Sequence, residues 1–349
     1  MKYNKVIHVH SLMKHIPATR YFIFLMISML FLGSCRFSSS RLQVDVSGIP
    51  LEEIHIHRYD QALFAIPMDS LEQGLVRIRP QFPFFLNTDL SDTAKISNLK
   101  EYLTNIRTIE FYQASENRFN DLSQLEGDLT DAFRHLRYYF PDAPIPRVYT
   151  YISGGEYEHP IQFVDSVLLI ALDAFLGTGF TPYGADGLPL YRVARMEPEF
   201  ILPDGIRAME EAYFPVTYPG NTLLDQMIDA GKRIYFIDAL IPGYPDRFKI
   251  GYTQKQMEWV TANEAQVWAA IIENQLLYTS QGGTIRTFLA DGPFTADFSP
   301  ESPPRLGEYL GWRMVKAYMQ ENQDVSLLEL ILESDAQKIL SKSKYKPNK

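Results

Sequence analysis

The chain has 349 residues, of which 46% are hydrophobic, and its 42 acidic side chains outnumber its 33 basic ones, which gives a formal net charge of −9 at pH 7. This hydrophobic content in a chain of this length supports a sizeable core and excludes an intrinsically disordered protein. The acidic balance argues against a protein that follows nucleic-acid phosphates with a basic stripe, so nucleic acid is not an expected partner.

The first segment has the pattern of a bacterial export signal. Residues 21–32 are apolar or nearly so, and no acidic residue precedes them. The basic residues before them are Lys2, Lys5, Lys14 and Arg20. Twelve residues are too few for a membrane-spanning helix, which needs roughly 20, so residues 1–34 are predicted to be a signal peptide. The alternatives are an unprocessed anchor, or a lone cysteine beside an ordinary cleavage site.

The end of this segment, Leu-Gly-Ser-Cys at 32–35, resembles the bacterial lipoprotein box. It predicts cleavage before Cys35 and acylation of its thiol, with palmitate an expected acyl group. Two or three acyl chains make membrane attachment effectively stable. The mature chain would carry 29 basic and 42 acidic side chains, a charge of about −13, and no free thiol, disulfide or cysteine-based metal site. Apart from this covalent lipid, no cofactor is expected.

The remaining chain divides into three predicted parts. Residues 35–50 read as a lipidated tether, 51–340 as a single mainly helical α+β domain with a small sheet, and 341–349 as a basic tail. No linker and no internal repeat argues for more domains. The residues after Cys35 lack the acidic pattern of a surface-export signal, so we expect the domain to face the periplasm. Inner and outer membrane both remain open.

In chain order, residues 51–59 alternate in polarity with one slip, which favours a strand with His55 and His57 on one face. Such a pair can hold a metal only with further ligands; otherwise both are outward polar side chains of an edge strand. Prolines break residues 60–110 into short helices, and 122–139 is an amphipathic helix.

Two strands are predicted next, at 147–152 and within 167–172. Asp173 follows the second strand as a lone acid in an apolar run. It either faces a cleft or is satisfied by loop amides, because an unpaired buried carboxylate is costly. Residues 177–195 read as a long irregular loop without a dinucleotide-binding fingerprint.

The C-terminal half is predicted to be helical. Helices are expected to open at Pro203-Asp204, at Asn221 or Thr222, at the capping box 253–256 with an end at Gly282-Gly283, at Arg305, and at the capping box 326–329. The spacing Gly307-x-x-x-Gly311 favours close helix packing over dimerisation in a membrane, because charged residues surround it. Aromatic residues in 177–195 and 282–304 either form a recognition surface or seal the core. They are Phe180, Tyr183, Tyr191, Phe288, Phe294 and Phe298.

Familiar catalytic motifs are absent. The sequence has no His-Glu-x-x-His, no Gly-x-Ser-x-Gly, no phosphate-binding loop and no cysteine nucleophile, so no catalytic, cofactor-binding or metal residue is expected. Asp225 and Asp229 have the i, i+4 spacing of two metal ligands on one helix, but solvation of the helix's outer face is the simpler interpretation. The rival hypothesis is a periplasmic hydrolase with Asp173, Asp204 and Glu264 around a cleft.

Several segments together resemble the gliding-motility lipoprotein GldB family of Bacteroidetes. They are 169–177 (LIALDAFLG), 198–204 (PEFILPD), 228–236 (IDAGKRIYF), 250–253 (IGYT) with Trp259 and Asn263-Glu264, and 302–307 (SPPRLG) with Gly311-Trp312. The resemblance covers nearly all of the mature chain. It implies a cell-envelope lipoprotein, without assigned enzymatic activity, that works with envelope proteins of the gliding and type IX secretion apparatus.

A remoter likeness connects the order of elements with zincin-like metalloproteases. The segments that would carry the metal ligands lack them here, because 206–211 reads IRAMEE and Ala230 precedes Gly231. The likeness implies a zincin-like scaffold without metal ligands, kept for binding, or a degenerate metalloprotease-like enzyme as part of the hydrolase alternative. It remains an analogy at the level of the fold.

Overall fold

The computed structural model describes residues 41–215 and 220–347. The predicted signal peptide, Cys35 and the first part of the predicted tether lie outside them. Leu42 and Val46 are buried against the fold, so the second part of that tether packs on the domain. None of the described helices combines the length and hydrophobicity that crossing a bilayer requires.

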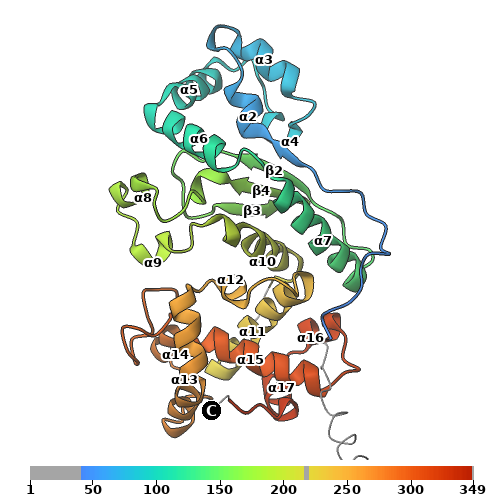
Figure 1. Ribbon diagram of the computed structural model, residues 1–349, viewed down its shortest axis with the longest axis vertical. Coiled ribbons are helices and arrows are strands. Elements are labelled where there is room, and N and C mark those ends of the chain that lie inside the picture. Colours follow the sequence, from blue (N-terminus) through green and yellow to red (C-terminus); the bar gives the residue numbers. More distant parts are fainter. Residues whose placement is uncertain (1–40, 216–219, 348–349) are drawn as a thin grey trace, which may run out of the picture. The chain divides into compact units, whose positions relative to one another are not determined.

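A four-stranded sheet lies at the centre of the N-terminal half (Figure 1). Its order is β1-β2-β4-β3, with β1, β2 and β4 parallel and β3 antiparallel to β4 at one edge. The strands are β1 (Ile56–Arg58), β2 (Arg147–Tyr151), β3 (Ile161–Val164) and β4 (Val167–Ala171). Asp165 and Ser166, at φ 49° and 61°, join β3 to β4, which is the conformation of a type I′ hairpin turn.

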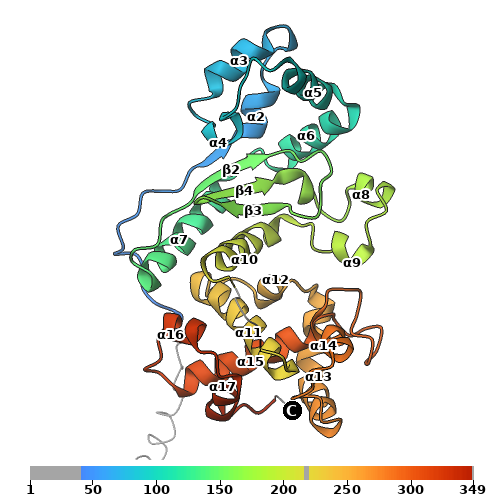
Figure 2. The same ribbon diagram turned by 180° about the vertical axis from the view of Figure 1, so that it is seen from behind.

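Helices cover both faces of this sheet (Figure 2). Leu168 and Ile170 belong to one hydrophobic core and Leu169, between them, to a second. The second core uses α2 (Tyr59–Phe64), α3 (Leu71–Ile78), α4 (Pro83–Leu86) and α5 (Thr93–Thr104). The first uses α6 (Ile106–Arg118), α7 (Ser123–Tyr139) and α10 (Ile201–Tyr213). With both faces covered, β4 reads as a continuous apolar run rather than an alternating one.

In the C-terminal half, two helices cross in backbone contact. They are α11 (Leu223–Leu240) and α15 (Leu306–Glu321). A Cβ atom at Gly311 would overlap the Met227 carbonyl oxygen, and one at Gly231 would overlap the carbonyl carbon of Gly311. The predicted packing role of Gly307-x-x-x-Gly311 is therefore confirmed. The surrounding helices are α12 (Asp246–Ile250), α13 (Gln254–Glu273), α14 (Gly282–Leu289), α16 (Leu327–Leu332) and α17 (Ala336–Ser343).

A buried polar cluster joins three of these helices. Asp238 on α11 accepts hydrogen bonds from the Trp312 indole of α15 at 2.9 Å and from the Lys249 ammonium of α12 at 2.6 Å. Lys316, one turn after Trp312, approaches the same carboxylate at 3.2 Å. Asp238 and Lys249 are both almost fully buried, and each has one further, more exposed ionic partner, Lys316 for Asp238 and Asp246 for Lys249.

The mainly helical α+β fold with one small sheet is confirmed. So are the helix at 122–139, the two strands, and the capping boxes that open α13 and α16. Thr222, rather than Asn221, caps α11. The caps depend on hydrogen bonds between residues three positions apart, whereas the strands could be predicted from their β-branched and aromatic residues.

Several boundaries differ from the sequence predictions. α13 ends at Glu273, where Gln275 takes a left-handed conformation (φ 55°), and Gly282 begins α14 instead of ending the preceding helix. The expected irregular loop 177–195 contains two short helices, α8 (Thr181–Ala185) and α9 (Leu190–Val193). The strand expected over 51–59 is restricted to β1, and β3 was not predicted.

We predict that Gly311→Ala destabilises the protein by roughly 3 kcal/mol or more, because the added methyl overlaps backbone atoms that cannot move independently. The matched control is Gly127→Ala inside α7, where nothing lies within 4 Å of the added Cβ. That change should gain up to about 1 kcal/mol from helix propensity. Chemical denaturation measures both, and equal stability of the two variants would contradict the crossing.

Candidate functional site

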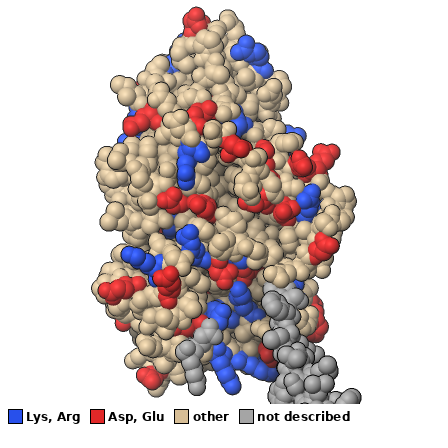
Figure 3. Space-filling view, viewed as in Figure 1, with Lys and Arg blue, Asp and Glu red and all other residues tan. Residues whose placement is uncertain are grey.

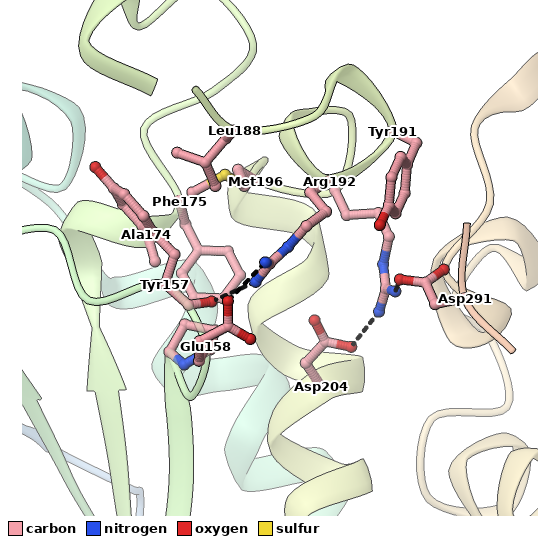
Figure 4. A pocket seen from close by; sticks show the side chains of 12 residues that line it. Tyr157, Glu158, Ala174, Phe175, Leu188, Tyr191, Arg192, Met196, Asp204 and Asp291 are labelled. Atoms are coloured by element: carbon pink, nitrogen blue, oxygen red, sulfur yellow. Dashed lines mark hydrogen bonds and ion pairs between the residues drawn. The ribbon is translucent and has the colours of Figure 1, made fainter. Parts of the chain in front are cut away.

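A cavity of about 420 Å³ lies beside the carboxyl end of β4 (Figure 4). Its lining residues come from the segments after β2 and β4, from α9 and the residues after it, from α10, and from the segment after α14. They are Tyr157, Glu158, Pro160, Ala174, Phe175, Leu188, Tyr191, Arg192, Arg195, Met196, Asp204 and Asp291. In sheets with parallel strands, the carboxyl ends are where ligand crevices usually form.

Asp173 follows β4 but is not among the lining residues. Its carboxylate accepts hydrogen bonds from the backbone N–H groups of Ser153, Gly154 and Gly155 and from the Ser153 hydroxyl, at 2.8–3.1 Å. Burial raises the pKa of Asp173, and the hydrogen bonds from 153–155 oppose that shift. These contacts agree with the interpretation that loop amides satisfy this carboxylate, and they tie the ends of β2 and β4 together.

Glu264 lies in a different network, on α13. Its carboxylate accepts hydrogen bonds from the hydroxyls of Tyr309 at 3.1 Å and Tyr345 at 2.8 Å, and from Arg313 Nε at 3.2 Å. The residue is fully buried. Tyr345 belongs to the predicted basic tail, so this contact fastens part of that segment to α13 and α15.

Asp204 is the one member of the predicted carboxylate trio that the structure brings to the cavity. It stands in the first turn of α10, with its Oδ1 atom 3.8 Å from Arg195 Nη2 and 3.9 Å from Arg207 Nε. In Figure 4, Asp204 and Asp291 face the same guanidinium from two sides. The three acids of the trio therefore have no common partner among the hydrogen bonds and ion pairs described above, and the structure does not bring them together.

The sequence analysis missed a cluster of three arginines around Asp204 and Asp291. Arg195 follows α9, Arg207 lies on α10, and Arg305 precedes α15. Arg305 is nearly buried and adopts a left-handed backbone conformation with φ 57°. It donates hydrogen bonds to Glu308 Oε2 at 3.0 Å and to the Gly251 carbonyl at 3.2 Å, while its Nε atom is 3.5 Å from Asp291 Oδ1.

A glycine, Gly251, lies where two of these arginines meet. Gly251 has φ 77°, and a Cβ there would lie 3.0 Å from Arg195 Nε and 3.1 Å from Arg305 Nη2. Glycine therefore permits both the left-handed turn and the close approach of the two guanidinium groups. Nothing in the sequence indicates that Arg195 and Arg305, 110 positions apart, meet at that turn.

His55, just before β1, and His57, within it, do not line this cavity. The His57 ring stacks on Tyr149 with centroids 4.9 Å apart, and burial lowers its pKa. The His55 side chain is 75% exposed and lies 4.0 Å from Glu126. Within 41–215 and 220–347, no three His, Cys, Asp or Glu side chains converge as a metal site.

Most of the loop aromatics seal the core. Tyr183 and Phe288 are fully buried, and Phe180 and Phe298 pack against the same core. Of the remaining two, Phe294 is 39% exposed and Tyr191 lines the cavity. On the face drawn in Figure 3, basic and acidic side chains are mixed with each other.

α10 also carries a buried acid, Glu210. Glu210 is 5% exposed and its carboxylate lies 3.1 Å from Arg233 Nη1. Burial raises the pKa of Glu210 to about 7, an effect that Asp229 and Glu211 reinforce and Arg233 opposes. This acid therefore titrates near neutral pH.

The sequence model of a protein family described as "Gliding motility protein GldB" matches residues 39–347. The match spans nearly everything that follows the predicted signal peptide. No curated protein and no solved structure matches the chain significantly.

We predict that the stability of the protein falls as pH rises from about 4.5 to 7, in part because of Glu210. Folded Glu210 keeps its proton up to about pH 7, whereas the ordinary pKa is 4.5, so the folded state binds more protons in this window. The contribution is at most roughly 3 kcal/mol, present below pH 4.5 and lost through pH 7. Denaturation at several pH values should give a flatter profile for Glu210→Gln.

The control for this measurement is Glu72→Gln, at an exposed position on α3. It should keep the wild-type slope. A profile for Glu210→Gln that runs parallel to the wild-type profile would refute the assignment.

Proposed function

The chain belongs to the GldB family of gliding motility proteins, and from this membership we propose that it is a membrane-anchored lipoprotein of the cell envelope that supports gliding motility or the type IX secretion machinery without catalysing a reaction. The observation that carries the proposal is the extent of the family match, 39–347, which takes in every described helix and strand. The protein acts by binding other envelope proteins of that apparatus.

Attachment to the membrane is through lipid on Cys35. Each buried methylene group contributes about 0.8 kcal/mol, so one acyl chain gives marginal binding and two or three hold the protein stably. The domain is then confined to a membrane surface that faces the periplasm, where its partners are also confined. Confinement raises the effective concentration of such partners without any additional contact area.

The arrangement of the acids supports a non-catalytic role. A nucleophile and base, or an acid and base, must lie within hydrogen-bond reach of each other or of the reacting atoms. Asp173 accepts hydrogen bonds from four donors and Glu264 from at least three, and neither residue lines the cavity. Asp204, which does line it, has guanidinium groups as its charged neighbours.

The rival hypothesis, a hydrolase, has one observation in its favour. Within the described part of the chain, Asp204 Oδ1 is buried in the cavity region without a hydrogen-bond partner, as a carboxylate held for substrate would be. Turnover of a substrate distinguishes this hypothesis from the non-catalytic role.

We predict that metabolic labelling with a fatty-acid analogue marks the wild-type protein and not Cys35→Ser, because the thiol is the acylated group. In cells that lack the gene, wild type should restore colony spreading and type IX secretion, while Cys35→Ser should restore little of either. Equal labelling of both proteins would contradict lipidation at Cys35. Full spreading and secretion in the deletion strain would contradict the proposed role.

A second prediction concerns chemistry. The purified protein should show no turnover in a broad peptidase and glycosidase screen and no stoichiometric zinc by metal analysis. Turnover that persists in Asp297→Asn, a change at an exposed aspartate, but disappears in Asp204→Asn or Asp173→Asn would replace this proposal with the hydrolase hypothesis.

A further inference from the structure

The guanidinium of Arg195 has unmet hydrogen-bonding capacity. Among the described residues it donates no hydrogen bond, and its charged neighbours, Asp204 and Asp291, are 3.8 and 3.7 Å away. Its Nε atom is buried without a partner, while the side chain as a whole is 26% exposed and lines the cavity. A guanidinium has five N–H donors in a planar fork, and leaving such donors dry is costly.

Two buried carboxylates elsewhere in this fold are well satisfied by contrast. Asp60 is held by two nitrogens of Arg58 and by the Thr150 hydroxyl, and Asp173 has four donors. Buried Nε atoms without a partner occur also on Arg134 and Arg137 of α7, but among the described residues the cavity region is distinguished by gathering four buried, unpartnered atoms in one cluster: the Nε atoms of Arg195, Arg207 and Arg305 and the Oδ1 atom of Asp204.

Asp291 stands between two guanidinium groups without completing either. Its Oδ2 atom is 3.7 Å from Arg195 Nη1 and its Oδ1 atom is 3.5 Å from Arg305 Nε. That Nε atom is also buried, and no described residue forms a hydrogen bond with it. The Asp291 side chain is 43% exposed and lies just after the end of α14. A carboxylate is thus attracted to this position, but the protein's own carboxylate does not reach hydrogen-bonding distance.

The charge balance selects a monoanion. If Asp291 turns toward solvent, the three positive charges of the arginine cluster face two negative charges, those of Asp204 and Glu308. One positive charge is then left for the carboxylate of a ligand to neutralise. A phosphate dianion would exceed that balance. Burial and the neighbouring Arg305 also lower the pKa of Arg195, as expected where positive charge is in excess.

The other residues that line the cavity indicate what the rest of the ligand is. Phe175, Leu188, Tyr191 and Met196 supply an apolar and aromatic surface within the cavity of about 420 Å³. Cavities of this size and character hold small molecules or one to two residues of a peptide. A ligand that fits both parts has an apolar or aromatic body and one terminal carboxylate.

From these contacts we propose that the cavity binds such a carboxylate through the guanidinium of Arg195, and that Asp291 competes with the ligand for the same position. The carboxylate belongs either to the C-terminus of a polypeptide or to a small organic acid. The site goes beyond the role in gliding and does not depend on it, so either proposal can fail without the other.

Calorimetric titration of the lipidated protein, in a neutral detergent, tests the site. The probes are N-acetyl-phenylalanine and its uncharged amide. The acid should bind at least about tenfold more tightly than the amide, because only the acid pairs with the guanidinium. Equal affinities, or no binding of the acid to either wild type or Asp291→Asn, would overturn the proposal.

Three variants separate the residues' roles. Arg195→Gln should weaken binding of the acid at least about tenfold, and Arg195→Lys, which keeps the charge but loses the fork, should weaken it less. Asp291→Asn should tighten binding severalfold, because the competing carboxylate is gone. Arg79→Gln removes an exposed arginine at the end of α3 and should leave the affinity unchanged.

Thermal unfolding checks that each variant is folded. If Arg195→Gln does not fold, Asp291→Asn and the comparison of acid with amide still decide the question. Unchanged affinity in a folded Arg195→Gln would overturn the proposal, and so would inorganic phosphate that binds more tightly than the acid.

A tetrapeptide, Ala-Ala-Ala-Phe, with a free or an amidated C-terminus, separates the two sources. If the free tetrapeptide binds at least as tightly as N-acetyl-phenylalanine, the ligand is the C-terminus of a polypeptide. If only N-acetyl-phenylalanine binds, it is a small acid. Both results retain the carboxylate site.

Discussion

The backbone contact between α11 and α15 is the constraint on which the C-terminal half depends. At Gly231 and Gly311 the two helices are so close that neither position accepts a side chain. Their separation is therefore set by main-chain atoms and not by adaptable side chains. This brings Trp312 to Asp238 and fixes the start of α15, where Arg305 enters the cavity region.

The sheet provides the second half of that cavity. α10 buries Leu202, Ile206 and Met209. The same helix carries Arg207, a member of the arginine cluster, and Asp204, which lies near Arg195 and Arg207. At the carboxyl end of β4, Asp173 gathers the amides of 153–155 and so holds the segment from which Tyr157 lines the cavity. A structural carboxylate thus supports the position of the binding surface without taking part in it.

The contrast between satisfied and unsatisfied charges gives the cavity its significance. Asp238 and Glu264 are deeply buried and hydrogen-bonded, as a stable interior requires. Around Asp291, the oppositely charged atoms lie 3.5 to 3.7 Å apart, and the buried Nε atoms of Arg195 and Arg305 have no hydrogen-bond partner among the described residues. Such exceptions to local consistency concentrate where a protein binds something other than itself.

The sequence by itself predicted an export signal with a lipid site and a resemblance to the family, and it determined the capped helices and the glycine pair of α15, because these depend on residues a few positions apart. It gave Asp173 and Asp204 as notable acids, but not their different surroundings. Only the tertiary structure decided the parallel pairing of β1, β2 and β4 and the meeting of Arg195, Asp291 and Arg305. The β1–β2 pairing and the contact of Arg195 with Asp291 join residues more than 90 positions apart, and periodicity and capping extend only over a few turns.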